Sequence, residues 1–304
     1  FCAGFLLIPM MGKENGLSLL VALQIMIALV VMAVIYFRSH DSNLRWGIIA
    51  LIAITGLVLA AQYPQWDRIL LSRSKYHNVD NPRILGSSWT RTLFNGSEIA
   101  AEDERSRLVF FGDGIGGFTT VFEHEADILG NVEYSMLNSG KVDASTESRD
   151  MVTQALLAHY PLLLHPSPEN VLVLGLASGI TAGEALHYPV ERLDILEINR
   201  QVVAGSHYFD PWNNEVLDDP RTELIIQDGR AHMTLTDRTY DVVISEPSNP
   251  WMAGLASLFT LDFFEAVRDR LNEGGVFCQW VHGYQMDWET FALIGRTFEE
   301  AFPN

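Results

Sequence analysis

The sequence predicts an α/β protein in which a parallel sheet follows a small β-rich domain, with transmembrane helices before both. Apolar runs that alternate with helical patterns after residue 165 indicate βα units, and hence a parallel sheet. Short β-rich runs around a glycine turn precede them, and two long apolar runs lie near the start. More than one domain is expected in 304 residues, and we predict three parts: residues 1–63, 64–150 and 151–304.

The first part is expected to cross a lipid bilayer. The run Leu17–Phe37 has Gln24 as its only strongly polar residue, and Trp46–Tyr63 is a second such run. Each is close to the roughly 20 residues that a hydrocarbon core requires. Phe1–Met11 has the composition of the tail of an earlier span. Buried core helices and a cleaved signal peptide both fit a pair of long runs less well.

The basic residues of the short flanks predict the orientation of these helices, because they are more numerous on the cytoplasmic side. One side carries five basic residues, Lys13, Arg68, Arg73, Lys75 and Arg83. The other side carries two, Arg38 and Arg45. We therefore expect the soluble part to be cytoplasmic. The chain starts at Phe1 and stops after a helical pattern at Asn304, so we expect a fragment of a longer protein, truncated at both ends.

The β-rich part is predicted to contain a hairpin. The runs Arg107–Phe111 and Gly117–Phe122 flank a turn that holds four glycines. A strand and not a helix follows these glycines, so they are not expected to hold a phosphate group. Glu123, His124 and Glu125 are adjacent, but successive residues of a strand point to opposite faces, and we expect no metal there.

The third part begins with a predicted helix over Met151–Leu164, which Pro166 and Pro168 end. Strands and helices then alternate. We expect strands over Val171–Leu174, Arg192–Glu197, Glu223–Ile226, Asp241–Ser245 and Gly275–Val281, and helices that start near Thr181, Asn199, Thr260 and Asp287. Ligands of such sheets bind at the carboxyl ends of the strands.

Four motifs at these strand ends predict an adenine nucleoside site. The first strand ends in a glycine turn, Gly175 to Gly179, that leads into a helix. Glu197 ends the second strand, where its carboxylate can accept bonds from both ribose hydroxyls. Asp228 and Glu246 follow the third and fourth strands. Any one of them could be an ordinary turn residue, but together and in order they indicate a nucleoside.

The net charge of −18 disfavours binding to nucleic acids, whose phosphates require Lys and Arg. An acidic surface would suit a cationic substrate such as a polyamine, although acidity for solubility alone is an open alternative. Cys2 and Cys278 lie far apart in the sequence, so neither a disulfide framework nor a metal cluster is expected.

Residues 137–303 resemble spermidine synthases, the aminopropyltransferases built on the Rossmann-like class I methyltransferase fold. The most specific segments are Asn138–Thr146, Leu157–Pro166 and Ser245–Gly254. With its membrane segments, the whole chain resembles bacterial inner-membrane proteins that fuse several spans to such a domain. The resemblance implies that the β-rich part caps the active site. It also implies a possible homodimer.

The resemblance further implies roles for individual residues. The glycine loop, with Gly175, Ser178 and Gly179, would hold decarboxylated S-adenosylmethionine, and no metal is implied. Glu197 would bind the ribose of this compound or of its product, methylthioadenosine. Its adenine would contact the residues that follow the third strand, Asp228 and Gly229.

The substrate-handling residues depart from the family pattern. Ser178 replaces an aspartate that holds the aminopropyl amine, and Glu246 and Asn249 replace the two aspartates of Asp-x-x-Asp-Pro. Gln154 replaces the histidine of a Tyr-His pair that the family has at this place, and Asp143 replaces a glutamine of the cap. Glu246 can still act as a base, Asp143 restores one charge, and Gln154 would line the acceptor pocket.

Three hypotheses therefore stay open. The first is a membrane-anchored enzyme that transfers an aminopropyl or related alkyl group to an amine or polyamine. The second is an S-adenosylmethionine-dependent methyltransferase, because Ser178 leaves room for the carboxylate of that compound. The third is a non-catalytic subunit of a membrane complex.

Overall fold

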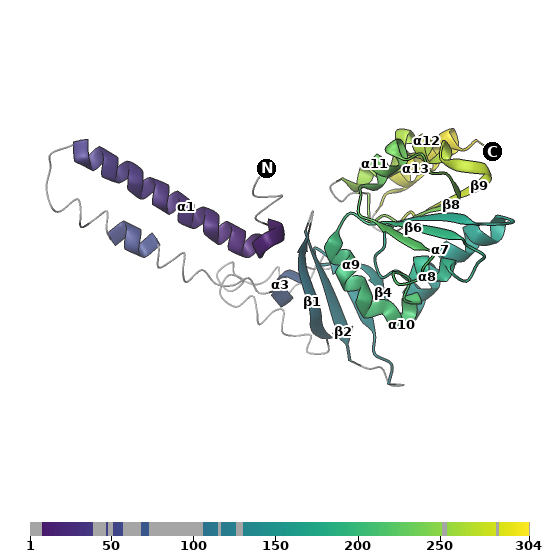
Figure 1. Cartoon of the computed structure of the whole chain (residues 1–304), viewed down its shortest axis with the longest axis horizontal. Coiled ribbons are helices and arrows are strands. Elements are labelled where there is room, and N and C mark those ends of the chain that lie inside the picture. Colours follow the sequence, from purple (N-terminus) through teal and green to yellow (C-terminus); the bar gives the residue numbers. More distant parts are fainter. Residues whose placement is uncertain are drawn as a thin grey trace. The chain divides into compact units, whose positions relative to one another are not determined.

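The computed structural model describes residues 8–38, 47, 51–56, 68–72, 106–114, 117–125, 130–250, 254–283 and 286–303. The chain divides into two compact units, Phe1–Leu71 and Ser72–Asn304 (Figure 1). Each unit is described by itself below. The domain boundaries predicted after residues 63 and 150 stay predictions.

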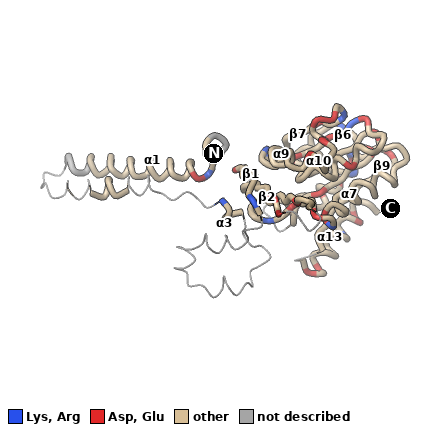
Figure 2. Tube along the Cα trace, turned by 90° about the horizontal axis from the view of Figure 1, so that it is seen from below, with Lys and Arg blue, Asp and Glu red and all other residues tan. Residues whose placement is uncertain are grey.

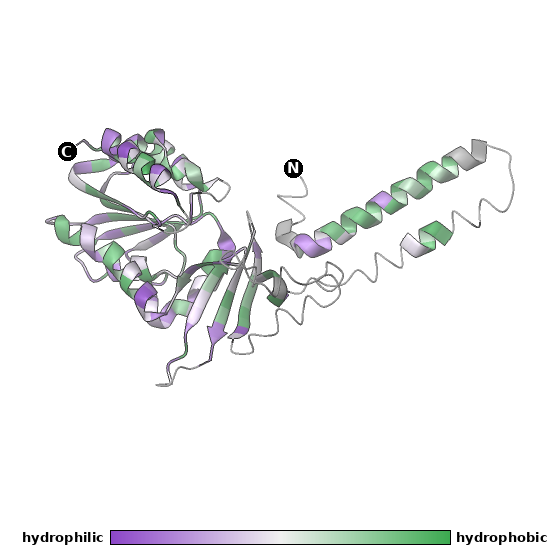
Figure 3. Ribbon diagram, turned by 180° about the vertical axis from the view of Figure 1, so that it is seen from behind, coloured by the Kyte–Doolittle hydropathy of each residue, from purple (hydrophilic) through white to green (hydrophobic). Residues whose placement is uncertain are grey.

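The first unit contains one long helix, α1 (Ile8–Arg38), which Gly12 interrupts with a non-helical backbone conformation. In its segment Met11–Val34 the most apolar stretch of 18 residues has a mean hydropathy of 2.8 and contains no buried residue, so by length and composition the segment could cross a membrane. Figure 3 shows that its residues are largely apolar, and Figure 2 shows charged residues near its start. The predicted span Leu17–Phe37 thus lies in a continuous helix. Of the second predicted span, Trp46–Tyr63, only residues 47 and 51–56 are described.

A short helix, α3 (Arg68–Ser72), precedes the antiparallel sheet of the second unit. This sheet has the strand order β1-β2-β3-β4. Its strands are β1 (Ser106–Gly114), β2 (Gly117–His124), β3 (Tyr134–Asn138) and β4 (Lys141–Ser145). The predicted hairpin is therefore confirmed, with Gly114 opposite Gly117 at its turn. Val121 and Met136 are fully buried against the hydrophobic core of the larger sheet.

The larger sheet is parallel and has the order β7-β6-β5-β8-β9. Its strands are β5 (Asn170–Leu174), β6 (Arg192–Leu196), β7 (Thr222–Ile225), β8 (Tyr240–Ser245) and β9 (Leu271–Gln279). All five predicted strands are present, although β9 starts at Leu271 and not at Gly275. The next two strands of the chain, β6 and β7, extend to one side of β5, and β8 and β9 extend to the other. The strand order therefore reverses at β5. Such a switch point is where this class of sheet binds its ligands.

Helices cover both faces of the parallel sheet (Figure 1). One face carries α7 (Ser148–Leu164), α8 (Ile180–Ala185), α9 (Arg200–Ser206), η2 (His207–Phe209) and α10 (Asp210–Asn213). The other carries α11 (Gly229–Leu235), η3 (Leu255–Phe259), α12 (Leu261–Arg268) and α13 (Trp288–Ala301). The helix starts predicted near Asn199, Thr260 and Asp287 are confirmed. Each of these residues is the N-cap of its helix, and its side chain accepts a hydrogen bond from a backbone N–H group.

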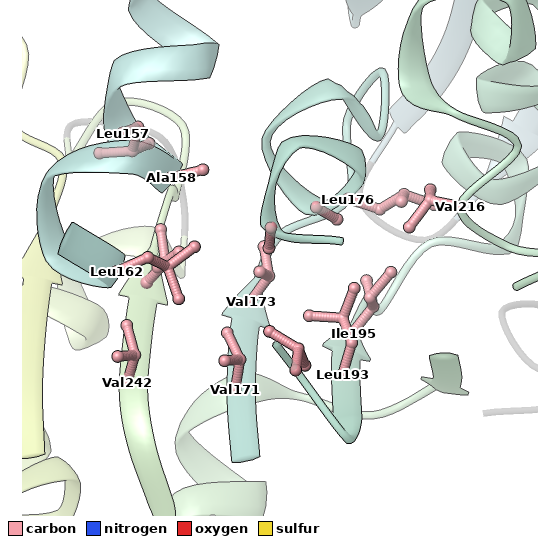
Figure 4. Packing of buried hydrophobic residues seen from close by; sticks show 14 of the residues in the cluster. Leu157, Ala158, Leu162, Val171, Val173, Leu176, Leu193, Ile195, Val216 and Val242 are labelled. Carbon is pink, nitrogen blue, oxygen red and sulfur yellow. The ribbon is translucent and has the colours of Figure 1, made fainter. Parts of the chain in front are cut away.

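Two clusters of apolar side chains, one on each face of the sheet, form the core of the second unit. Figure 4 shows Leu157 and Leu162 of α7 directed toward Val242 of β8 and Val171 of β5. On the opposite face, aromatic rings of α12, β9 and α13 pack together, among them Phe264, Phe277 and Phe298. Burial on both faces explains why the central strands read as unbroken apolar runs.

Leu162→Ala is expected to lower the free energy of unfolding by about 2–5 kcal/mol, because it leaves a cavity between α7 and β8. The side chain of Leu162 is 1% exposed, whereas that of its neighbour Leu163 is 71% exposed. Leu163→Ala is the matched control and should change stability by no more than about 0.5 kcal/mol. Urea denaturation of both variants measures the difference, and equal losses would contradict the packing of α7 described above.

Candidate functional site

The site is organised around the point where the chain leaves β5 and β8. Gly175, the first residue after β5, has a φ of 96°, and a Cβ added there would lie 2.8 Å from the carbonyl oxygen of Glu246. The Glu246 N–H donates to Leu174 O at 2.9 Å, so the two strand ends remain paired up to the turn. Only glycine combines this φ with so close an approach. The turn therefore holds Gly175 and Glu246 side by side.

The rest of the glycine loop is fastened to α7. Gly179 has a φ of 82° and precedes α8. The buried Ser178 hydroxyl donates to Gln154 Oε1, and Gln154 Nε2 donates to Ser145 O at 3.0 Å. Two predicted site residues, Ser178 and Gln154, are thus brought into contact with each other. In this arrangement Gln154 positions the loop, and its predicted contact with substrate stays a prediction.

Glu197 follows β6 and faces the same loop. Its carboxylate accepts hydrogen bonds from the backbone N–H groups of Asn199, at 2.8 Å, and Leu176, at 3.2 Å. Burial raises the pKa of Glu197, while these backbone donors act in the opposite direction. The carboxylate is therefore held in a fixed orientation beside the glycine loop, as a ribose-binding group requires.

Asp228 and Gly229 follow β7 at the same edge of the sheet. Asp228 is the N-cap of α11, and its Oδ1 accepts from the Ala231 N–H at 2.8 Å. A Cβ on Gly229 would lie 2.9 Å from a methyl group of Leu174, the last residue of β5. The absence of a side chain thus lets this turn approach the glycine loop. Whether Asp228 and Gly229 contact adenine stays a prediction.

Glu246 and Asn249 follow β8. Burial raises the pKa of Glu246 to about 7, with smaller contributions from the negative charges of Asp150 and Asp143, against a hydrogen bond from Thr181. Asn249 is fully buried, and neither its Nδ2 nor its Oδ1 has a hydrogen-bond partner among the residues that the structure describes. Buried amides are nearly always paired. Both residues thus have the properties of groups that meet a ligand.

Asp143, which the sequence analysis counted as restoring one charge, is paired with a lysine. Its Oδ1 lies 2.6 Å from Nζ of Lys141, a residue whose side chain is only 3% exposed. Oδ1 also accepts from the Ser248 hydroxyl at 2.8 Å, and Oδ2 accepts from Asn138 Nδ2 at 2.8 Å. Sequence reasoning missed Lys141. The spacing could have revealed it, since residues two apart on a strand share a face.

A chain of hydrogen bonds joins the two sheets through the site. Asn199, whose N–H binds Glu197, donates from Nδ2 to Thr119 Oγ1 at 3.0 Å. Thr119 donates to Asn138 Oδ1 at 2.6 Å, and Asn138 donates to Asp143. The β1–β2 turn approaches closely here, because a Cβ on Gly114 would lie 2.1 Å from Asn199 Oδ1. The smaller sheet therefore helps to position both Glu197 and Asp143.

His282, which the sequence analysis also missed, lies near this network. It is buried and accepts a hydrogen bond from the Trp280 indole at 3.2 Å. Burial and the positive charge of Lys141 lower the pKa of His282 to about 4, so its imidazole is neutral at pH 7. Because His282 follows β9, it brings the end of a fifth strand to the site.

The adjacent residues Glu123, His124 and Glu125 lie outside the site. Glu123 forms an ion pair with Arg107 at 3.0 Å, and His124 Nε2 lies 2.7 Å from the Ser135 hydroxyl. No group of three metal-binding side chains lies together in the described part of the chain.

Comparison with known proteins identifies relatives of one kind. The profile of the spermine/spermidine synthase domain matches residues 150–304. A polyamine aminopropyltransferase of Thermoanaerobacter sp. (strain X514) is 31% identical over 186 residues, which cover 60% of this chain and 66% of the relative. The polyamine aminopropyltransferase of Thermotoga maritima is 28% identical over 218 residues, 71% of each chain. The chain thus spans slightly less than two thirds of the first relative.

Solved structures show the same fold. A crystal structure of spermidine synthase in complex with the transition state analogue AdoDATO superposes with a TM-score of 0.58 and 28% identity, and covers 65% of this chain and 66% of that one. Spermidine synthase from Thermotoga maritima gives a TM-score of 0.56 at 28% identity, with coverage of 65% of each chain. The predicted Rossmann-like α/β fold is therefore confirmed.

Gly175→Ala is expected to destabilise the second unit by roughly 1–3 kcal/mol and to weaken nucleoside binding at least tenfold. Both effects arise because the new methyl group would push the glycine loop away from Glu246. Gly295→Ala in α13 is the matched control, since a Cβ there meets nothing within 4 Å. In a helix it should add about 0.5–1 kcal/mol of stability. Thermal unfolding and calorimetric titration measure the two effects, and unchanged binding in Gly175→Ala would contradict the site.

Proposed function

This chain belongs to the spermine/spermidine synthase family, and we propose that it transfers an aminopropyl group from decarboxylated S-adenosylmethionine to an amine. The observation that carries the proposal is the position of Glu246. Its backbone lies at the switch point of the sheet beside the glycine loop, and burial raises the pKa of its carboxyl group to about 7. A base with a pKa near the working pH is well suited to proton transfer.

The nucleoside would bind along the strand ends. Glu197 is the proposed ribose acceptor, because its carboxylate lies beside the loop formed by Gly175, Ser178 and Gly179. The adenine would lie near Asp228 and Gly229, which approach the same loop through Leu174. A carboxylate fixed by backbone N–H groups needs little reorganisation to bind two hydroxyl groups, which favours affinity.

In the proposed reaction the ionised Glu246 takes one proton from the ammonium group of the acceptor. The freed nitrogen lone pair then forms a bond to the methylene carbon attached to sulfur. The bond between that carbon and sulfur breaks, and its electron pair returns to sulfur, so the sulfonium becomes the thioether methylthioadenosine. Asn249, with both amide atoms free among the described residues, would orient the acceptor nitrogen toward that carbon.

One observation favours methyl transfer as a second candidate. Ser178 presents no charge in the glycine loop, and its hydroxyl donates to Gln154. A loop without a carboxylate would not repel the carboxylate of intact S-adenosylmethionine. Calorimetric titration of the full chain with both sulfonium compounds and with methylthioadenosine separates the candidates. Tighter binding of the decarboxylated compound supports aminopropyl transfer, tighter binding of the intact one supports methyl transfer, and no binding supports a non-catalytic subunit.

We also propose that α1 anchors the protein in a bacterial inner membrane, with the second unit in the cytoplasm. Support comes from the apolar length of Met11–Val34 and from the absence of buried residues in its most apolar stretch. A homodimer and partners in a membrane complex stay predictions.

Replacing Ile27 and Val30 together by Arg is expected to release the full chain from membranes. Both side chains are more than half exposed near the middle of α1, and each Arg there costs about 2.5–3.5 kcal/mol of insertion free energy. The control replaces both residues by Leu and should stay in the membrane fraction. Extraction with alkaline carbonate measures the outcome, and release of the unaltered chain would reject the anchor.

The rate of amine alkylation is expected to rise with pH through about 7 and then to level off, because only ionised Glu246 can accept a proton. Glu246→Gln should remove this rise and lower kcat/KM by about 10²–10⁴-fold. Glu299→Gln, at an exposed position of α13, is the control and should keep the wild-type profile. A Glu246→Gln variant with wild-type activity would reject the proposed base.

The same carboxyl group should make stability depend on pH. Folding raises its pKa from 4.5 to about 7, so the folded state keeps a proton that the unfolded state has released. Stability therefore falls as pH rises between these values, and Glu246→Gln should abolish that fall. Above pH 7 the Gln variant should be more stable than the wild type by roughly 1–3 kcal/mol. Urea titrations at pH 5 and pH 8 measure this, and a less stable variant at pH 8 would contradict it.

A further inference from the structure

A buried lysine joins the smaller sheet to the segment that follows β8. The side chain of Lys141 is 3% exposed, and its Nζ lies 2.6 Å from Oδ1 of Asp143. Nζ also donates to Val142 O at 3.3 Å and to the Ser248 hydroxyl at 3.0 Å. Burying an ammonium group is unfavourable unless its N–H groups find acceptors, and here three are present. Among these partners only Ser248 comes from outside β4.

Ser248 is held in a closed ring of hydrogen bonds. Its hydroxyl accepts from Lys141 Nζ and donates to Asp143 Oδ1 at 2.8 Å, while Nζ donates to the same Oδ1. Each of the three atoms is therefore bonded to the other two. All three bonds involve a charged group, and such bonds are shorter and stronger than those between neutral groups. These three residues, called the ring cluster, thus fix the Ser248 hydroxyl relative to β4.

The segment that contains Ser248 carries two residues of the proposed reaction. Glu246, the proposed base, precedes Ser248 by two positions, and Asn249 follows it directly. The backbone N–H of Glu246 is still paired with the end of β5. Proline has no N–H group, so Pro247 and Pro250 cannot donate backbone hydrogen bonds beyond that point. The position of the segment therefore depends largely on side-chain contacts, and those of Ser248 lead to β4.

The ring cluster continues the chain of hydrogen bonds that begins at Glu197. Oδ2 of Asp143, which lies outside the ring, accepts from Asn138 at 2.8 Å. From Asn138 that chain leads back through the smaller sheet to Glu197. With Ser248 added, a path of polar contacts runs from the proposed ribose-binding carboxylate to the segment of the proposed base. Such a path can set their separation, and a misplacement of about 1 Å can lower a rate roughly 10²-fold.

The charge of Lys141 also favours this arrangement. Burial raises the pKa of Glu246, and the negative charges of Asp150 and Asp143 raise it further. Burial raises the pKa of Asp150 as well, while the positive charge of Lys141 acts in the opposite direction. Both aspartates thus lie within electrostatic range of Glu246, and carboxylates repel one another most strongly where water is excluded. The ammonium group therefore allows the segment of Glu246 to approach β4 despite these negative charges.

We propose that Lys141 and Ser248 are positioning residues of the transfer reaction. Through the ring cluster they hold the segment 246–249 against the smaller sheet, and so set the place of the base relative to the bound nucleoside. In this role neither residue touches the reacting atoms. The inference rests on the proposed function, because it concerns the base of that reaction.

Ser248 is tested first, because its side chain is small and its replacement changes no charge. Ser248→Ala removes the hydroxyl and should lower kcat by roughly tenfold or more, while the Kd of methylthioadenosine changes by less than about twofold. Ser248→Thr keeps a hydroxyl and should retain at least about a third of the wild-type kcat. Turnover of decarboxylated S-adenosylmethionine with putrescine by the full chain gives kcat, and calorimetric titration gives the Kd.

Ser167→Ala is the matched control. The Ser167 hydroxyl is exposed and also donates to a carboxylate, that of Glu169 at 3.2 Å, but it precedes β5 at the end of that strand opposite to the site. This variant should keep the wild-type kcat and Kd. Three results would overturn the inference: an undiminished kcat in Ser248→Ala, a Ser248→Thr variant as slow as Ser248→Ala, or an equal loss of nucleoside affinity in Ser248→Ala.

Lys141→Met removes the cation and keeps an unbranched side chain. It should lower kcat at least as much as Ser248→Ala does. Because both residues act through one contact, the double variant Lys141→Met/Ser248→Ala should be less than about threefold slower than Lys141→Met. Losses that multiply in the double variant would show that the two residues act independently, which contradicts the inference. If Lys141→Met does not fold, the two Ser248 variants decide.

Failure of the proposed function has a different signature. A wild-type chain that binds methylthioadenosine but transfers no aminopropyl group to putrescine or spermidine would overturn the proposed function, and this inference with it. Wild-type turnover together with an undiminished kcat in Ser248→Ala would overturn the inference alone.

Discussion

The structure of the second unit depends on the contact between the Gly175 turn and the end of β8. The Gly175 turn ends β5, and β5 and β8 are neighbours in the sheet. The segments that follow them diverge, one to α8 on one face of the sheet and the other to η3 on the opposite face. A side chain at Gly175 would collide with the Glu246 carbonyl group, so the approach requires glycine. This close approach of the two backbone segments also places the glycine loop next to Glu246.

The smaller sheet completes the site through polar contacts. Thr119 and Asn138 stand between the Glu197 side of the site and Asp143, and each is bonded on both sides. A fully paired network of this kind is rigid, because breaking one link leaves a buried group without its partner. The positions of Glu197 and Asp143 are therefore set together, although they belong to different sheets.

The sequence predicted most of the fold because local patterns determine it. Strands buried on both faces appear as apolar runs, and N-caps such as Asn199 and Thr260 mark where helices begin. The early start of β9 was not predicted, because the expected strand began at Gly275 and the observed one begins at Leu271. In the site, Glu197 and Glu246 could be found from their places at strand ends. One partner of Asp143 could not, because Ser248 lies 105 residues farther along the chain, and no local pattern reports such a contact.

The hydrogen bonds of the chain from Asn199 to Asp143 all run in one direction. From Asn199 to Thr119, from Thr119 to Asn138 and from Asn138 to Asp143, each residue donates to the next. An aspartate at position 138 would put an acceptor where a donor is needed, opposite the carboxylate of Asp143. Such a mutation would be tolerated only when Asp143 also changes to a residue that donates. In evolution these residues should change as a group, and related sequences should show them as correlated substitutions.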